Sequence, residues 1–320
     1  MNDAIISMMQ RYSCKNSEDY ENALKEIVQE VALMGLSRSD FFSKAAFYGG
    51  TALRIFYGLP RYSEDLDFSL EVPDSAFNLA TYLSYVEKEL KAYNFSMTVR
   101  KKEKTKETAV QSAFIKGNTV QNILEITSND ASVYGINPQA LLKIKFEVDT
   151  NPPEGAGFQY MNAINPSIYK VRLYDMPSLF AGKVHAVLCR DYKHRVKGRD
   201  FYDYIWYLKK GCTVNLTHLQ KRMEQSGKWN PEEKLTLSCL KELLNQRFQS
   251  VDLESAKADV SPFLSQSEKA GLEFWSADFF TDITERYLNY ECSVNSPSPK
   301  LEPYLPRPKT GQELPTTAPN

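Results

Sequence analysis

The sequence predicts a mixed α/β (α+β) protein in which a sheet core is followed by a helical domain. Strand-like segments alternate with helical periodicity up to about residue 170, and the apolar spacing from Met176 to about Asn289 is mostly helical. The last residues hold seven of the sixteen prolines and few large apolar groups. We therefore expect an N-terminal helical segment at 1–40, a core at 41–170, a helical C-terminal domain at 171–292 and a Pro-rich disordered tail at 293–320.

The expected elements follow from periodicity and from capping and turn residues. Residues 3–35 are expected to be helical with a polar break near 14–18, and the next helix to be capped by Ser37 or Ser39. A helix over 75–94 has an apolar stripe formed by Phe77, Leu79, Leu83, Val86 and Leu90. Strands are expected over 95–101, 109–115, 122–127 and 141–149, and a charged hairpin turn over 102–108.

The bulk properties are those of an ordinary cytoplasmic protein. With 320 residues and a formal net charge of −1, the chain can bury a sizeable core, and its overall charge neither predicts nor excludes nucleic-acid binding. The five cysteines are widely spaced, odd in number and form no CxxC pair, which argues against a disulfide framework or a zinc site. We expect no signal peptide, because no long apolar run follows a basic start, and no membrane association.

The segment YGGTALRIFYGLPRYSEDLDFS, residues 48–69, carries the most specific chemistry. Asp65 and Asp67 are two positions apart in a strand-like run, so both carboxylates point to the same face. Two like charges so close need compensation, and a divalent cation is the usual one. Gly49 and Gly50 allow a tight turn and a close approach of the backbone to a phosphate. A phosphate cradle and metal-holding carboxylates are the minimum equipment for moving a nucleotide.

Each part of this segment has an ordinary explanation when it is taken alone. An Asp-x-Asp pair is common on solvated strands, and Gly-Gly is a common turn. The combination is more specific, because Leu66 and Phe68 alternate with the carboxylates and a helix is expected to open directly after the glycines. Arg54 and Arg61 lie in the same segment, where they are expected either to contact phosphate or to pair with carboxylates.

The pattern GGTALR…R-x-S-x-DLDF resembles the nucleotidyltransferase toxins of the AbiEii/AbiGii type, within the DNA polymerase β-like nucleotidyltransferase superfamily. The resemblance continues through LLKIKFEVDTNPP at 141–153 and LFAGKVHAVLCRDYKHRVKGRDFYDYIW at 179–206. It implies that residues 41–170 form a nucleotidyltransferase core and that nucleotide is bound by the motif residues Gly49, Gly50, Thr51, Arg54, Arg61 and Ser63. The Gly-Ser of the wider superfamily is Gly-Gly-Thr here, and the Thr51 hydroxyl can still face a phosphate.

Metal-assisted nucleotidyl transfer needs a third carboxylate. One face of the strand LLKIKFEVDT carries Lys143, Lys145, Glu147 and Asp149. The resemblance places the third acid on this strand, where Glu147 matches best and Asp149 is the rival, and it implies that Lys145 contacts the nucleotide. Asp65, Asp67 and Glu147 would then hold Mg²⁺ or Mn²⁺. A solvated amphipathic strand with paired Lys and Glu is the alternative interpretation.

The segment 183–206 is expected to complete the site. Lys183 lies in an apolar helical run, where its burial is costly unless it meets a phosphate or a carboxylate. Basic residues follow that make a patch for a triphosphate or an RNA backbone: Arg190, Lys193, Arg195, Lys197 and Arg199. Asp200 and Asp203 share one helical face, although the helix dipole alone could favour Asp200. The resemblance implies catalytic roles for Lys183, Asp200 and Asp203, and nucleotide binding by Lys183 and Arg199.

The resemblance implies a toxin of a bacterial toxin–antitoxin or abortive-infection (phage-defence) system with a separately encoded antitoxin. It also implies that this toxin is an NTP-dependent nucleotidyltransferase (EC 2.7.7 type) that transfers NMP, with magnesium, to a nucleic-acid acceptor such as tRNA. Two alternatives are a transferase of the same fold acting on a small molecule or a protein hydroxyl, and a catalytically silent nucleotide-binding regulatory module. The basic patches count against the first, and the intact glycines, aspartates and Lys183 count against the second.

Overall fold

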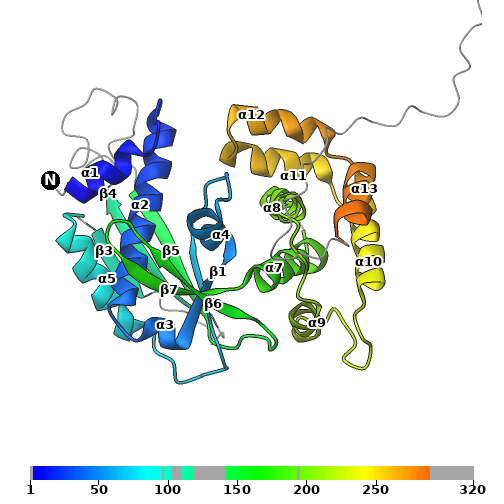
Figure 1. Cartoon of the computed structure of the whole chain (residues 1–320), viewed down its shortest axis with the longest axis horizontal. Coiled ribbons are helices and arrows are strands. Elements are labelled where there is room, and N and C mark those ends of the chain that lie inside the picture. The colour runs from blue at the N-terminus through cyan, green and yellow to red at the C-terminus, as the bar shows by residue number, and fades with distance from the viewer. Residues whose placement is uncertain (1–2, 96, 102–109, 119–140, 193–194, 289–320) are drawn as a thin grey trace, which may run out of the picture.

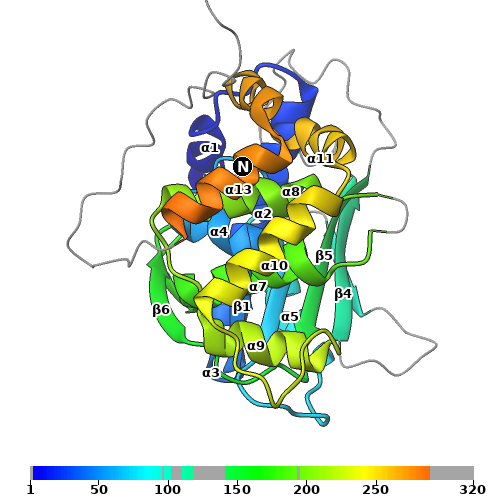
Figure 2. The same cartoon turned by 90° about the vertical axis from the view of Figure 1, so that its right-hand side faces the viewer.

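A computed structural model describes residues 3–95, 97–101, 110–118, 141–192 and 195–288. A mixed sheet with helices on one side forms the N-terminal part of the molecule, and a group of helices forms the C-terminal part (Figure 1). Figure 2, turned by a quarter, shows the helices α10 and α13 crossing in front of α7 and α8. The predicted fold class, a mixed α/β core followed by helices, is confirmed.

In the described part of the chain, the sheet has seven strands in the order β3-β4-β5-β2-β1-β7-β6. Its strands are β1 (Ala45–Tyr48), β2 (Leu66–Leu70), β3 (Met97–Lys101), β4 (Val110–Asn118), β5 (Leu141–Asp149), β6 (Phe158–Ala163) and β7 (Tyr169–Tyr174). Strand β2 is central, because it pairs antiparallel with β1 and parallel with β5. Strand β1 also pairs parallel with β7. The motif that contains Asp65 and Asp67 therefore lies in the middle of the sheet.

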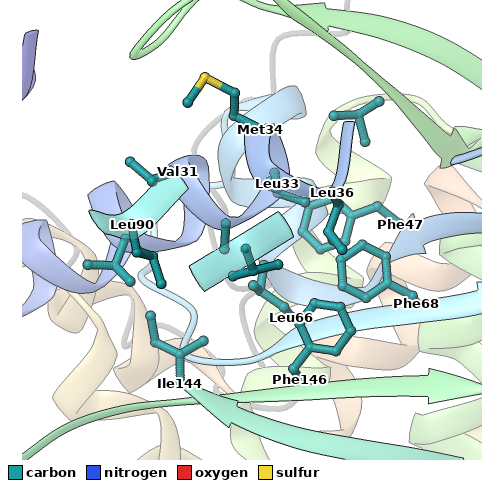
Figure 3. Close-up of a cluster of buried hydrophobic side chains, with 14 of the residues drawn as sticks. Val31, Leu33, Met34, Leu36, Phe47, Leu66, Phe68, Leu90, Ile144 and Phe146 are labelled. Atoms are coloured by element: carbon teal, nitrogen blue, oxygen red, sulfur yellow. The ribbon is translucent and has the colours of Figure 1, made fainter. Parts of the chain in front are cut away.

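One face of the sheet packs on α2 (Ser17–Ser37) and α5 (Ala80–Ala92), with α1 (Asp3–Gln10) and α3 (Phe41–Lys44) beside them. The apolar residues of β2 and β5 alternate toward this face, where Phe68 stacks on Phe146 with ring centroids 4.7 Å apart. Figure 3 shows these rings with Leu66 against the buried side of α2. Because successive strand residues point to opposite faces, the acidic residues between them point away from this core.

The helical part begins where β7 ends. The Asp175 side chain caps α7 (Met176–Cys189) by accepting a hydrogen bond from the Ser178 N–H at 2.9 Å. The helices that follow are α8 (Gly198–Lys209), α9 (Leu216–Gln225), α10 (Leu237–Ser250), α11 (Leu253–Val260), α12 (Gln266–Lys269) and α13 (Ala277–Tyr287). The short 3₁₀ segments Ser261–Phe263 and Ala270–Phe274 flank α12. Within the helical part, the Phe180 ring of α7 stacks on the Tyr207 ring of α8, with ring centroids 4.4 Å apart.

Several element boundaries differ from the prediction. The helix expected over 75–94 begins only at Ala80, although its predicted stripe is buried. The N-cap of α3 is Asp40 rather than Ser37 or Ser39, although the Ser39 hydroxyl accepts a hydrogen bond from the Phe41 N–H. Strands β6 and β7 were not predicted, and the sheet consequently runs to Tyr174. The expected strand at 122–127, the turn at 102–108 and the tail at 293–320 lie outside the described residues.

Candidate active site

The acidic residues of β2 and β5 meet on the face of the sheet opposite the α2 core. The parallel register places Asp67 directly beside Glu147, and Asp65 lies just before β2. Asp149 is two residues farther along, beside Ser69, and its carboxylate accepts a hydrogen bond from the Asn151 N–H at 3.0 Å. Strand register therefore distinguishes the two rival acids and places Glu147, not Asp149, next to Asp67.

A cavity of about 460 Å³ opens between this acidic edge and the helical part. The sheet side contributes Tyr48, Gly49, Gly50, Leu53, Asp67, Glu147 and Tyr174. The helical side contributes Ser178, Leu179, Gly182, Lys183, His185, Ala186, Cys189, Arg190, Asp200, Tyr207 and Arg222. Sequence segments that are far apart thus line one hollow, and its volume lies in the range of small-ligand sites.

The carboxylates in the cavity repel one another. Burial, together with the negative charges of Asp65 and Glu147, raises the pKa of Asp67 to about 7. Burial also raises the pKa of Asp65. On the rim, Lys145 Nζ lies 2.6 Å from Glu147 Oε2 and balances part of this charge. Further positive charge next to Asp67 would therefore stabilise its ionised form.

The arrangement and chemistry of these acids bear on metal binding. Within the described ranges, no three His, Cys, Asp or Glu side chains already form a set of metal ligands. Asp67 and Glu147 are nevertheless adjacent in register, and the charges of Asp65 and Glu147 both act on Asp67. Carboxylate oxygens are the ligands that Mg²⁺ and Mn²⁺ prefer, so the donor chemistry fits the cation that the sequence predicts.

Positions 49 and 50, next to the acids, leave no room for a side chain. Gly49 has φ +84°, and a Cβ there would lie 2.7 Å from Asp67 Oδ2. A Cβ on Gly50 would lie 2.8 Å from the Ser63 hydroxyl. These residues open α4 (Gly49–Tyr57), whose first N–H groups have no partner within the helix and border the cavity. An exposed helix N-terminus of this kind binds anions such as phosphate.

We predict that Gly49→Ala damages both the fold and the site. A left-handed backbone costs a residue with a Cβ about 1–2 kcal/mol, and the new methyl group would push directly on the Asp67 carboxylate. Urea unfolding should show a loss of that order, and nucleotide affinity should fall. Gly58→Ala is the control, because Gly58 also has φ +74° but nothing lies within 4 Å of its Cβ position. Equal loss of affinity in both variants would contradict the packing argument.

The Thr51 hydroxyl does not face the cavity. It donates a hydrogen bond to the main-chain oxygen of Asp65, and the residue is buried. The expectation that Thr51 offers its hydroxyl to a phosphate is therefore replaced by a structural role. Thr51 ties the first turn of α4 to the residue that leads into β2, and so fixes the glycines relative to the acids.

Lys183 meets carboxylates in the structure. Its Nζ lies 3.0 Å from Asp200 Oδ1 and 2.8 Å from Asp203 Oδ2. Burial alone would lower the pKa of Lys183, but the charges of Asp203 and Asp200 outweigh it and raise that pKa above its usual value. Lys183 therefore stays protonated at neutral pH and lies in the cavity wall. Asp200 lines the cavity with it and also accepts a hydrogen bond from Arg190 at 2.7 Å.

Asp203 is shielded from the cavity. Its side chain has no exposed surface, and Arg61 donates two hydrogen bonds to it, from Nε and Nη2, each of 2.6 Å. Burial would raise the pKa of Asp203, but Arg61 and Lys183 outweigh that effect and lower it. Arg61 is itself only 2% exposed. The predicted nucleotide contact of Arg61 and the predicted catalytic role of Asp203 are corrected to an ion pair that joins the sheet part to α8 and positions Lys183.

Other predicted nucleotide-binding residues lie outside the cavity lining. Arg54 points to α2, where its Nε donates to Glu26 at 2.7 Å, so its predicted phosphate contact is replaced by pairing with a carboxylate. Ser63 packs against Gly50. Arg199 lies 3.6 Å from Glu64 and 4.3 Å from the centre of the Phe263 ring. Lys145 remains on the rim beside Glu147. Lys193 and His194 lie outside the described residues.

Sequence reasoning missed Arg222, which enters the cavity from α9. Its Nε is buried and has no hydrogen-bond partner in the described part of the chain, and no ion pair forms there with its guanidinium. Burial and the positive charges of Arg222 and Arg190 lower the pKa of His185, another lining residue, to about 4. The tyrosines Tyr48 and Tyr174 stack at 5.4 Å beside them. The sequence around Arg222, QKRME, has no feature that separates it from the adjacent Lys221.

One cavity holds a helix that starts with Gly-Gly, two carboxylates on neighbouring strands and, facing them, a buried lysine. Nucleotidyl transfer requires groups of these kinds. The family described as "Nucleotidyl transferase AbiEii toxin, Type IV TA system" matches residues 31–282. The chain therefore belongs to this family of nucleotidyltransferase toxins, as its sequence motifs predict. Membership in a Type IV toxin–antitoxin family implies an antitoxin partner. Across the described ranges, no helix combines the length and the apolar character that a membrane crossing requires.

Solved structures give a weaker likeness. JHP933 from Helicobacter pylori has a TM-score of 0.45 and 16% identity, covering 86% of this chain and 94% of that one. A second H. pylori protein, assigned as a nucleotidyltransferase, has a TM-score of 0.44 and 17% identity, covering 83% and 93%. No curated protein matches significantly. The family assignment rests on the family match and not on these likenesses.

Proposed function

We propose that the protein transfers a nucleotidyl group from an NTP to the terminal hydroxyl of an RNA such as tRNA, with Mg²⁺ or Mn²⁺ as cofactor. One observation carries this proposal. A single cavity brings the Asp67 and Glu147 carboxylates together with the N-terminus of α4 and the cations of Lys183, Arg190 and Arg222. Carboxylates suit a metal, and the helix start and cations suit a triphosphate.

The transfer is a displacement at the α-phosphorus of the NTP. The acceptor oxygen forms a bond to the α-phosphorus of the NTP, the bond from that phosphorus to the β-phosphate oxygen breaks, and pyrophosphate leaves. We assign Glu147 to accept the proton from the attacking hydroxyl, because it is the cavity carboxylate on the exposed rim. A divalent cation, when bound by Asp65, Asp67 and Glu147, supplies charge neutralisation at the phosphates.

The other lining residues bind and orient the NTP. The N–H groups that open α4 offer hydrogen bonds to phosphate oxygens. Lys183 and Arg222 approach from the helical side, so negative charge that develops on the departing pyrophosphate meets fixed positive charge. Asp200 holds both Lys183 and Arg190 in place at 3.0 and 2.7 Å. Its role in the proposal is to orient cations.

The experiment is a transfer assay with four NTPs, each labelled in the α-phosphate, in the presence of magnesium and total tRNA. The account predicts label on RNA with wild-type protein, and none with the Asp65→Ala/Asp67→Ala variant or with excess EDTA. Label on protein or on a small molecule would favour a transferase with a different acceptor. Binding of NTP without any transfer would favour a silent nucleotide-binding module.

We predict that Arg222→Gln weakens NTP binding specifically. A charge-assisted hydrogen bond is worth about 1.5–3 kcal/mol, which corresponds to a rise in the KM for NTP of about 10-fold or more. The control is Lys221→Gln, since Lys221 is the neighbouring cation and pairs with Glu224 at 2.8 Å outside the cavity. Steady-state kinetics should show a raised KM for Arg222→Gln alone. A similar KM in both variants would remove Arg222 from the binding site.

A further inference from the structure

A second cavity adjoins the first at the C-terminal end of α7. It has a volume of about 500 Å³, and it shares two lining residues, Cys189 and Arg190, with the candidate active site. Its remaining polar wall comes from the loop after α9 and from α10 and includes Lys228, Gln246, Arg247 and Ser250. We call it the α9–α10 basin. Because the two hollows share two lining residues, they adjoin at this end of α7.

The basin wall is positively charged. Arg190, Lys228 and Arg247 line it, whereas Asp191 is its one acidic lining residue. Lys228 is exposed, and within the described ranges its ammonium group forms no ion pair. The positive charges of Lys228 and Arg247 both oppose the rise that burial causes in the pKa of Cys189, a residue that lines both cavities.

Arg247 is fixed in position by the end of α7. Its Nε donates to the Val187 oxygen at 2.9 Å, and its Nη2 donates to the Arg190 oxygen at 2.8 Å. The guanidinium also lies 4.8 Å from the centre of the Tyr192 ring. These contacts hold a cation at the junction, since they use main-chain oxygens and a ring and leave its charge uncompensated by any carboxylate in the described part of the chain.

A third cavity, of about 380 Å³, is less suited to a polyanion. It lies on the far side of α4, shares no lining residue with the active site, and contains Glu26 and Glu30 beside Arg11 and Arg54. Those cations already pair with the acids, at 3.2 Å for Arg11 and 2.7 Å for Arg54. Of these three cavities, the basin is the one that adjoins the active site and also holds cations, Lys228 and Arg247, with no carboxylate partner in the described residues.

We propose that the α9–α10 basin binds the backbone phosphates of the RNA acceptor next to its reacting terminus. This inference rests on the proposed nucleotidyl transfer to RNA and adds where the acceptor lies. The terminal hydroxyl reaches the α-phosphate in the active-site cavity, and the adjoining nucleotides cross the end of α7 into the basin. Lys228 contacts a phosphate there, and Gln246 and Ser250 on α10 offer polar groups to the same strand.

The test measures the Kd of a short single-stranded oligoribonucleotide that has a free 3′ hydroxyl. Fluorescence anisotropy at several salt concentrations gives this Kd for wild type, for the variants and for their controls. Lys228→Ala should raise Kd and reduce the slope of log Kd against log salt by about 0.7, the value for one lost phosphate contact on a single strand. Gln246→Glu should raise Kd several-fold through repulsion. The matched controls are Lys234→Ala, exposed on the same loop, and Gln249→Glu, exposed on the same helix, neither of which lines the basin.

Kinetics separate this inference from the proposed function. For Lys228→Ala and Gln246→Glu the KM for RNA should rise while the KM for NTP stays as in wild type. If wild type transfers label to RNA but these variants match their controls, the proposal that the basin binds RNA is overturned and the proposed function stands. If wild type transfers no label to RNA, both are overturned. Unfolding curves that match wild type, expected because Lys228 and Gln246 are exposed, show that a change in Kd reflects binding.

Discussion

Replacing Asp67 with Asn is expected to lower the rate of nucleotidyl transfer by about a thousandfold, which corresponds to about 4 kcal/mol of transition-state stabilisation. Asp67 is the carboxylate that faces the cavity between Gly49 and Glu147, so it has no substitute at that position. The amide keeps the shape of the side chain but removes the charge that holds a divalent cation. Transfer should be measured as initial rates at saturating NTP and magnesium.

The fold is expected to survive this substitution. Burial and the charges of Asp65 and Glu147 make the ionised form of Asp67 unfavourable, so a neutral amide removes repulsion when no metal is bound. The unfolding free energy of Asp67→Asn in EDTA at neutral pH should therefore equal or exceed that of wild type. Function and stability thus pull in opposite directions at this residue, as is common in active sites.

The matched control is Asp149→Asn. Asp149 lies on the same strand face as Glu147 but beside Ser69, outside the cavity lining. Its substitution should change the transfer rate by only a few-fold, whereas Glu147→Gln should behave like Asp67→Asn. If Asp149→Asn proves as damaging as Asp67→Asn, the identification of Glu147 as the third acid is wrong.

Replacing Asp203 with Asn is expected to cost about 3–5 kcal/mol of unfolding free energy. The reason is the fully buried Arg61, which donates two hydrogen bonds of 2.6 Å to Asp203 and would keep its charge without a partner. Lys183 would also lose its 2.8 Å contact, so transfer should fall as well. Urea denaturation with a measured slope checks the loss of stability.

An exposed ion pair provides the comparison. Arg38 lies 3.5 Å from Glu89 with its side chain 52% exposed, and Arg38→Met should cost less than about 1 kcal/mol. The double variant Arg61→Met/Asp203→Asn should be more stable than the sum of the two single losses predicts, because neither charge is left without its partner. Additive losses would show that Arg61 and Asp203 do not act as a pair.

Much of this site could be predicted from local pattern. The alternation of Asp65 and Asp67 with Leu66 and Phe68 predicted a strand with one acidic face, and β2 confirms it for Asp67 within the strand. The same reasoning placed Glu147 on a strand, although only the parallel register of β2 and β5 could separate it from Asp149. The strand β7 was missed although Tyr169, Val171 and Leu173 alternate with polar residues, a usable signal in a short segment.

Local sequence pattern could not predict which side chains contact one another in the folded protein. Arg61 was expected to meet either a phosphate or a carboxylate, and its partner Asp203 lies 142 positions away in sequence. Arg222 was not singled out, because an arginine on an amphipathic helix is usually solvated and only the packing of α9 brings it into the cavity. Contacts of this kind depend on tertiary packing, which period and spacing do not encode.

The most direct test of nucleotidyl transfer follows two labelled preparations of the same NTP in parallel reactions. One preparation carries the label in the α-phosphate and the other in the γ-phosphate, and each is incubated with protein, magnesium and tRNA. The account predicts that α-label appears on the RNA while γ-label leaves entirely as pyrophosphate, in equal amounts. Appearance of γ-label on the RNA would mean that the cavity transfers a phosphoryl group, and would contradict the central claim.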